Sequence, residues 1–176
     1  MKRKVGNRLP QITAEQREQI RGSVDFFTLN HYTTHYASRA AINEGEDDLN
    51  NNSGFFQDQH VQLTSDPSWE KTTMNWNVVP WGLRKLLRWI DKRYGHPKIV
   101  ISENGTSFED SLENGRIEDT RRIAYYEGYI RACHEAIADG IDLKGYFIWS
   151  LLDDFEWNLG YSKKFGLHYV DFETGK

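Results

Sequence analysis

The sequence is poor in cysteine and proline and contains no long apolar segment. It has one cysteine, Cys133, and four prolines among 176 residues. A single cysteine excludes a disulfide framework and a cysteine-based metal site within the chain, and it fits a reducing compartment. No run approaches the roughly 18 apolar residues of a membrane span, and no apolar stretch follows the basic start as it would in a signal peptide. We therefore expect no membrane span, and a cytoplasmic location is slightly favoured.

An excess of basic charge is also missing. The chain has 26 acidic and 22 basic residues and a formal net charge of -4, so we expect no nucleic-acid partner. The six histidines are scattered, and there is no His-Glu-x-x-His pair, no phosphate-binding loop and no Gly-x-Ser-x-Gly elbow. We accordingly expect neither a metal nor a cofactor.

Aromatic residues, in contrast, are abundant. They make up 14% of the chain, with 6 Trp, 9 Tyr and 9 Phe, although the mean hydropathy is only -0.73. An ordinary aromatic core is one explanation. Rings beyond those a core needs are the other, and such rings often line sites for flat, partly apolar ligands such as sugars.

Helical and strand patterns alternate along the chain. They predict helices from a capping box at Thr13 to about Gly22, from Pro80 to Gly95 and from Asp119 or Thr120 to Gly140, and strands over 23–32, 99–102 and 143–150. Residues 33–78 show little periodicity and are expected to form a long loop with a mobile middle, whereas 165–170 are expected to add a small strand. The apolar face of the last helix is assigned to Ile123, Tyr126, Ile130, Cys133 and Ile137, which makes Cys133 a buried, inert thiol. This alternation predicts an α/β fold of parallel strands with helical crossovers.

Polar and aromatic residues stand where the predicted strands end. Asn30 and Tyr32 end the first strand, Glu103 the second and Trp149 the third, and the last is followed by Asp153, Asp154, Glu156 and Trp157. Parallel strands bring these ends to one rim, where ligands bind. Each of these residues alone could have a purely structural role, but together they suit the binding of a carbohydrate. A tyrosine hydroxyl beside Glu103 would keep this carboxylate ionised, as a nucleophile requires.

Several motifs carry a resemblance to a known family. They are Ile-Ser-Glu-Asn-Gly at 101–105, Gly-Tyr-Phe-Ile-Trp-Ser-Leu-Leu-Asp-Asp-Phe-Glu-Trp at 145–157, Leu-Asn-His-Tyr at 29–32, Pro-Trp-Gly-Leu-Arg at 80–84, and the segments 160–162 and 165–167. In order and spacing they resemble the C-terminal part of the family 1 glycoside hydrolases, the β-glucosidase family, in its lactase-phlorizin-hydrolase and klotho-like branch. The resemblance covers nearly the whole chain.

The resemblance implies a fold, a reaction and a site. The fold would be the C-terminal portion of a (β/α)₈ TIM barrel, about three βα units that do not close a barrel alone, with residues 1–176 as a single partial domain. The reaction would be retaining hydrolysis of a β-linked glucoside or related hexoside, with Glu103 as nucleophile and Tyr32 orienting it. The implied substrate-binding residues are Asn30, Trp149, Glu156, Trp157 and Phe165. The Glu156-Trp157 pair, in place of a phosphate-binding set, implies an unphosphorylated sugar.

One part of the family pattern is absent. The general acid/base of the family lies in a Thr-x-Asn-Glu-Pro motif, and this sequence has none. A retaining enzyme needs two carboxyls about 5 Å apart, and only proximity suggests Asp153, Asp154 or Glu156 as the second. Three alternatives follow: a fragment or truncated isoform that is inactive alone, a klotho-like non-catalytic module that binds a sugar or protein, and a chain that acts with a missing barrel half or as an oligomer.

Overall fold

The computed structural model describes residues 6–39, 61–109 and 115–175. The chain divides into two compact units, one comprising Met1–Val24 with His35–Pro67 and the other Asp25–Thr34 with Ser68–Lys176. The first unit contains a 3-10 turn, η1 (Gly6–Arg8), the helix α2 (Ala14–Ile20) and the strands β2 (Tyr36–Arg39) and β3 (Val61–Thr64). The second unit contains every residue predicted for the site.

The start of α2 confirms the predicted capping box. The Gln16 amide donates to Thr13 Oγ1 at 3.1 Å, and the Thr13 amide donates to Gln16 Oε1 at 2.9 Å. The prediction of a loop throughout 33–78 is wrong at its flanks, because β2 and β3 form an antiparallel pair. All residues of both strands are exposed, so the alternation of buried apolar residues that reveals a strand is missing. The middle of the predicted loop lies outside the described residues.

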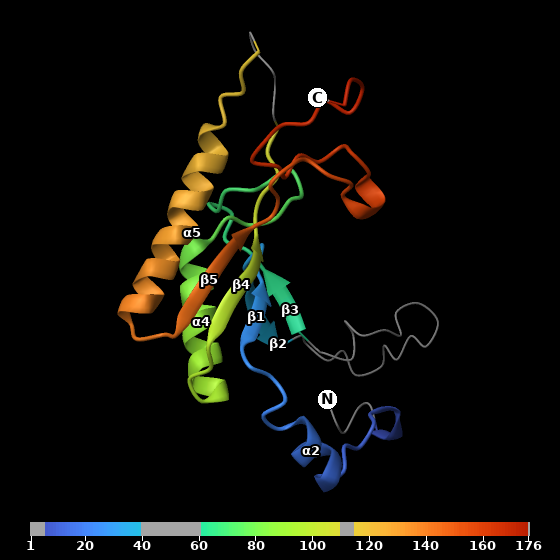
Figure 1. Cartoon of the computed structure of the whole chain (residues 1–176), viewed down its shortest axis with the longest axis vertical. Helices are drawn as coiled ribbons and strands as arrows, with labels where there is room; N and C mark the ends of the chain where they lie inside the picture. Colours follow the sequence, from blue (N-terminus) through green and yellow to red (C-terminus); the bar gives the residue numbers. More distant parts are fainter. Residues whose placement is uncertain (1–5, 40–60, 110–114, 176) are drawn as a thin grey trace. The chain divides into compact units, whose positions relative to one another are not determined.

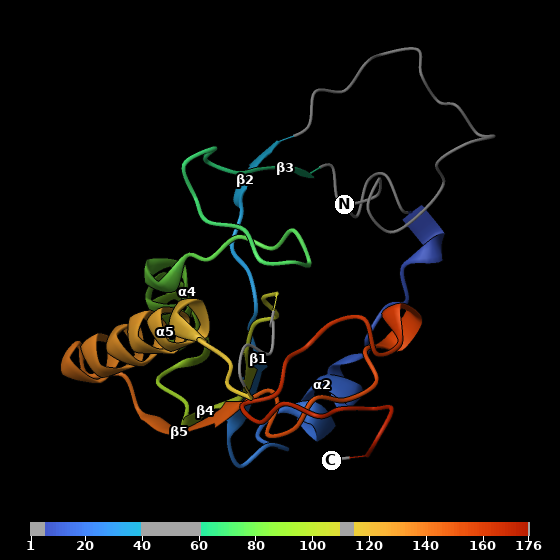
Figure 2. The ribbon, with the colours of Figure 1, turned by 90° about the horizontal axis from the view of Figure 1, so that it is seen from above.

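A three-stranded parallel sheet organises the second unit (Figure 1). Its strands are β1 (Phe27–Asn30), β4 (Ile99–Asn104) and β5 (Leu143–Ile148), in the order β1-β4-β5. The helices α4 (Pro80–Tyr94) and α5 (Thr120–Ala138) connect them and lie side by side on one face of the sheet (Figure 2). The α/β prediction is confirmed. Among the described residues that follow β5, η2 (Trp157–Leu159) is the one regular element, and the strand predicted over 165–170 is reduced to an isolated bridge between Leu152 and His168.

The core lies between the sheet and the two helices. Pro80 begins α4 as predicted, and Gly95 ends it in the left-handed conformation at φ 75°. Leu83 and Leu87 of α4 are fully buried, as is Ile101 of β4. At the surface Arg84 joins the helices, with two hydrogen bonds of 2.8 Å to Asp139 and one of 2.8 Å to Glu135.

The predicted apolar face of α5 is partly wrong. Ile123, Ile130 and Ile137 are exposed by 58%, 50% and 52%, and the helix instead buries Arg122, Tyr125, Tyr126, Tyr129, Ala132, Cys133 and Ala136. Cys133 is buried as predicted, and burial raises its pKa to about 11. The error arises because isoleucine marks the core by hydropathy alone, whereas the space beneath this sheet is filled by tyrosine rings.

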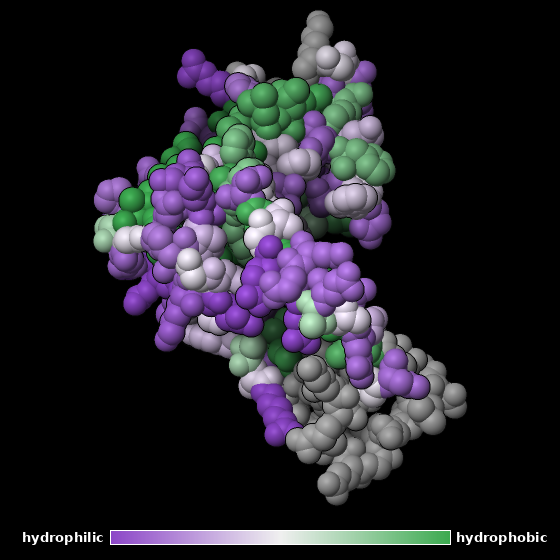
Figure 3. Space-filling view, turned by 60° about the horizontal axis from the view of Figure 1, so that its bottom comes forward, coloured by the Kyte–Doolittle hydropathy of each residue, from purple (hydrophilic) through white to green (hydrophobic). Residues whose placement is uncertain are grey.

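Many apolar side chains also reach the surface, and Figure 3 shows green apolar patches among the hydrophilic residues of one face. Trp81, Trp89, Phe147 and Phe155 are among the exposed large residues. Within the described ranges, no helix combines the length and hydropathy needed to cross a bilayer.

Candidate active site

An irregularity in β4 turns Glu103 toward the predicted site. Ile99 and Ile101 face the core, so strict alternation would turn Glu103 to the core as well. The pairing with β1 instead shifts, because Leu29 pairs with Ile101 but Asn30 pairs with Glu103. A bulge of this kind inserts one residue and redirects the side chains that follow. As a result Glu103 lines a pocket, and Asn104 takes the buried position.

Glu103 is bound directly by the predicted tyrosine. The Tyr32 hydroxyl donates to Glu103 Oε2 at 2.6 Å, a short distance typical of a hydrogen bond to a charged acceptor. Burial, this hydrogen bond and the nearby carboxylates Glu103 and Glu156 raise the pKa of Tyr32 far above its usual value. Tyr32 therefore stays protonated and acts as a donor. Beside it, Ser102 Oγ donates to Asn30 Oδ1 at 2.5 Å.

The structure brings all the predicted site residues together in one pocket of about 380 Å³. Its lining consists of Asn30, Tyr32, Trp76, Glu103, Trp149, Glu156, Trp157 and Phe165. Seven of these eight residues were predicted for the site, from three strand ends and the loop that follows β5. Their assigned roles stay predictions.

Trp76 is the lining residue that sequence reasoning missed. Its ring lies 5.2 Å from that of Tyr32 and 5.9 Å from that of Phe165, while Phe165 meets Tyr32 edge-on at 6.3 Å. These three rings form an apolar wall next to the carboxylate. Trp76 comes from an irregular segment before α4, so no strand-end pattern marks it. The aromatic excess of the composition was the available signal.

The other acidic residues differ in their surroundings. Asp153 is buried, accepts from the amides of Gly166 at 2.9 Å and Val170 at 3.0 Å, and lies 3.4 Å from Lys164 Nζ. Asp153 therefore holds the backbone at both ends of the segment from Gly166 to Val170. Glu156 lines the pocket, and burial followed by the charges of Asp154 and Glu103 raises its pKa. For Asp154 the pKa is likewise raised, mainly by burial and then by Asp153.

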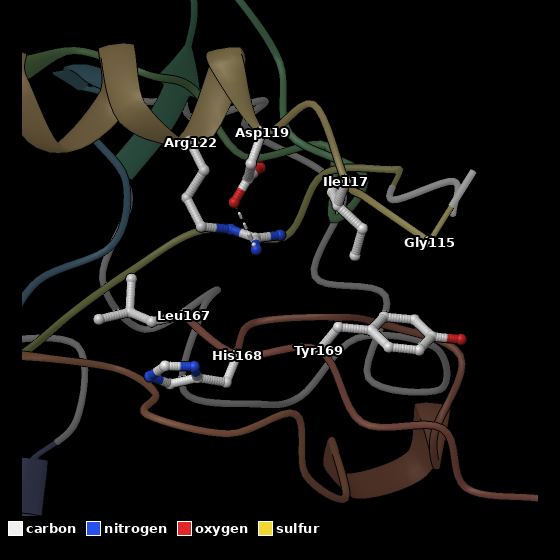
Figure 4. Close-up of a pocket in the computed structure, with 7 residues that line it drawn as sticks. All are labelled: Gly115, Ile117, Asp119, Arg122, Leu167, His168 and Tyr169. Atoms are coloured by element: carbon white, nitrogen blue, oxygen red, sulfur yellow. Dashed lines mark hydrogen bonds and ion pairs between the residues drawn. The ribbon is translucent and has the colours of Figure 1, made fainter. Parts of the chain in front are cut away.

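A second hollow of about 340 Å³ lies between the start of α5 and residues 167–169 (Figure 4). Its most buried charged side chain is Arg122, which donates to Asp119 Oδ2 at 2.9 Å and to the carbonyl oxygen of Gly166 at 2.7 Å. Asp119 is the only carboxylate among the lining residues. The chemistry expected of paired carboxylates therefore belongs to the pocket around Glu103. In the described ranges no three His, Cys, Asp or Glu residues are grouped to hold a metal ion.

Comparison with known proteins gives one consistent result. The family model described as Glycosyl hydrolase family 1 matches residues 1–176. The chain is 41% identical to β-glucosidase 42 of Arabidopsis thaliana, covering 99% of this chain and 36% of the relative. It is 42% identical to the cytosolic β-glucosidase of Cavia porcellus, covering 95% and 34%. None of these matches supports the lactase-phlorizin-hydrolase or klotho-like branch suggested by the sequence.

Comparison with solved structures also finds β-glucosidases. A β-glucosidase from Thermotoga maritima in complex with castanospermine superposes with a TM-score of 0.82 at 35% identity, over 99% of this chain and 36% of that one. The same organism's enzyme in complex with glucoimidazole gives 0.79 at 36% identity, over 96% and 34%. The chain thus spans about a third of the length of these relatives, and its fold matches part of their barrel without closing one.

Proposed function

Since the chain belongs to glycosyl hydrolase family 1, we propose that it forms part of a retaining β-glycosidase in which Glu103 is the nucleophile. The observation that carries this proposal is the hydrogen bond of 2.6 Å from Tyr32 to Glu103 in a pocket lined by tryptophan and carboxylate. Residues 1–176 would then be one partial glycosidase domain, which the match of the family model over the whole chain supports.

In the proposed reaction a Glu103 oxygen attacks the anomeric carbon of a β-glucoside or related hexoside. A glycosyl ester forms, the bond from this carbon to the aglycone oxygen breaks, and the oxygen leaves with the electron pair. The Tyr32 hydroxyl donates a hydrogen bond to the carboxylate and orients it before the attack. Water then attacks the anomeric carbon and gives up a proton to solvent, and the bond from this carbon to Glu103 breaks. The sugar leaves with its anomeric configuration retained, and the Glu103 carboxylate is regenerated.

The remaining pocket residues would bind the sugar. The rings of Trp149 and Trp157 offer apolar faces for its C–H groups, while Glu156 and Asn30 are placed to bind hydroxyls. Phe165 is 1% exposed and closes the wall behind Tyr32.

Covalent trapping tests the proposal. The probe is a 2,4-dinitrophenyl 2-deoxy-2-fluoro-β-glucoside, whose leaving group departs without a proton donor. We expect a stable fluoroglucosyl ester on the purified chain, located at Glu103 by peptide mass spectrometry, and no ester on Glu103→Gln. Glu127→Gln, on the exposed face of α5, is the matched control and should be labelled like the wild type. Labelling at another residue, or equal labelling of Glu103→Gln, would contradict the proposal.

A second candidate is a non-catalytic module that binds a sugar in the same pocket. The observation in its favour is the aromatic lining of the pocket, where Trp76, Trp149 and Trp157 offer ring faces that suit the binding of a sugar without any reaction. Glucoimidazole, which the Thermotoga maritima enzyme binds, is a suitable probe. Saturable quenching of tryptophan fluorescence by glucoimidazole, combined with no trapping by the fluoroglucoside, would favour this second function.

A further inference from the structure

The side chain of Asn104, next to Glu103, is bound from three different elements. Its Nδ2 donates to the His31 carbonyl oxygen, just after β1, at 2.7 Å and to the Tyr125 hydroxyl of α5 at 3.0 Å. Its Oδ1 accepts from the Tyr146 hydroxyl of β5 at 2.5 Å. Asn104 is fully buried, so in the folded chain its side chain has these protein partners and no contact with solvent.

These bonds lie where the regular ladder of the sheet is interrupted. The register of β4 shifts against β1 between Leu29 and Asn30, and against β5 between Ile101 and Asn104. Such shifts disrupt ladder hydrogen bonds on both sides of β4. The side-chain amide of Asn104 connects the segment after β1 and the strand β5 at this level, and so adds side-chain hydrogen bonds where the register is irregular.

The same irregularity gives Glu103 its direction. Because side chains alternate along a strand, Asn104 can point to the core only while Glu103 points to the pocket. The main chain adds two anchors, since the His31 amide donates to the Glu103 carbonyl oxygen at 2.9 Å and the Trp149 amide donates to the Asn104 carbonyl oxygen at 2.9 Å.

The backbone has little room to move here. A Cβ atom added at Gly105 would lie 1.7 Å from the carbonyl oxygen of Trp149, so the chain after Asn104 passes directly against the end of β5. A change at Asn104 therefore cannot be absorbed by a shift of the neighbouring main chain toward β5.

We propose that Asn104 is a positioning residue for Glu103. By holding the bulge of β4 to the segment after β1, to β5 and to α5, it keeps the Glu103 carboxylate at the Tyr32 hydroxyl. Its importance for the reaction rests on the proposed function, whereas its effect on the position of Glu103 does not.

The test compares three variants of the full chain. Tyr146→Phe removes only the hydroxyl that binds Asn104 Oδ1, and Asn104→Ala removes the whole amide. Leu87→Ala is the control, because it opens a cavity in the core on α4 and has no polar group near the bulge. Should Asn104→Ala fail to fold, Tyr146→Phe carries the test, since it keeps the size of the ring.

The first readout is the ¹³C signal of the Glu103 side-chain carboxyl in glutamate-labelled protein, assigned by its loss in Glu103→Gln. Tyr32→Phe defines the shift produced when the Tyr32 hydrogen bond is lost. We expect Tyr146→Phe and Asn104→Ala to move the signal in the same direction, and Leu87→Ala to leave it in place. An unchanged signal in Tyr146→Phe, or an equal change in Leu87→Ala, would overturn the inference.

The second readout is the trapping reaction, with its rate constant and its saturation constant measured separately. Displacement of a reacting group costs on the order of 10- to 100-fold in rate, so we expect the rate constant of Tyr146→Phe to fall by about this factor, with the saturation constant within about threefold of the wild type. A fall confined to the saturation constant would overturn the inference. If the wild type is not trapped while the ¹³C signals behave as expected, the proposed function fails and the positioning of Glu103 by Asn104 stands.

Discussion

At the scale of single residues, the neighbours of Glu103 determine the direction of its side chain. Ser102 occupies the extra position of the bulge in β4, so that Glu103 faces the pocket and Asn104 the core. Tyr32 then reaches the carboxylate with a hydrogen bond of 2.6 Å. One inserted residue in the strand therefore decides whether the Glu103 carboxylate lines the pocket or faces the core.

His31, between Asn30 and Tyr32, is a buried histidine beside the site. It is 6% exposed and its ring lies 5.9 Å from that of Tyr129. Burial lowers its pKa from 6.5 to about 4, with a smaller opposing effect of a backbone hydrogen bond. Between these two pH values the unfolded chain binds a proton that the folded chain does not, so stability falls as the pH is lowered.

We predict that this single group reduces the free energy of unfolding by about 3 kcal/mol as the pH falls from 6.5 to about 4. Histidine NMR titration should show one ring that stays neutral to about pH 4. Urea unfolding should show a steeper pH dependence for the wild type than for His31→Gln, whereas His168→Gln, at an exposed position, should behave like the wild type. A His31 ring that titrates near 6.5 would contradict this prediction.

At the scale of elements, α5 shows which residues determine the buried face of a helix. Its core side consists mainly of Tyr125, Tyr126 and Tyr129. The rings of Tyr125 and Tyr129 lie 4.3 Å apart, and the hydroxyl of Tyr125 accepts the hydrogen bond from Asn104. The helix therefore contributes both apolar area and the hydrogen-bonding groups that the strand ends need.

Ile123, Ile130 and Ile137 form a stripe on α5 at intervals of seven residues, each at least half exposed. We predict that replacing all three by Gln lowers the melting temperature much less than one replacement at a fully buried position, because about half of each side chain stays exposed after folding. The binding of a hydrophobic dye such as ANS should decrease at the same time. Ala136→Gln, at a fully buried position of the same helix, is the contrasting variant and should unfold the chain. A large loss of stability in the triple variant would show that the stripe is buried.

At the scale of the whole molecule, the chain matches about a third of each relative, and its fold, with three parallel strands, matches part of their barrel. Its pocket holds the proposed nucleophile, but the sequence has no Thr-x-Asn-Glu-Pro motif to supply a proton to the leaving group. General acid catalysis contributes roughly 10² to 10⁴ in rate. The rate of hydrolysis by this chain alone should therefore depend strongly on how readily the aglycone departs without a proton.

We predict that the purified chain releases dinitrophenolate from 2,4-dinitrophenyl β-glucoside, and that its rate on methyl β-glucoside is lower by at least about 10²-fold. Both rates are measured with Glu103→Gln as the inactive reference. Similar rates on the two substrates would show that a residue of this chain donates the proton, and Glu156→Gln would then be the first variant to examine.

The structure confirms some of the predictions made from the sequence and not others, and the reasons are physical. The helices at Pro80 and Thr120 and the strand at Ile99 were predictable, because a proline at the first helical position, helical spacing of apolar residues and an apolar run are local signals. The exposed pair of β2 and β3 was not, since neither strand buries a face. For the site, residues placed by strand ends were found, whereas Trp76, placed by an irregular segment, was not.

The sequence by itself determined that Glu103, Tyr32 and Trp149 would meet, because parallel strands bring their carboxyl ends to one rim. Only the tertiary structure decided the direction in which Glu103 points. Alternation along β4 would turn Glu103 toward the core, and the shifted register turns it toward the pocket instead. Hydrogen bonds that join Asn104 to β5, to α5 and to the segment after β1 hold this register. These partners lie 21 to 73 residues from Asn104 along the chain, so no local pattern can encode their geometry.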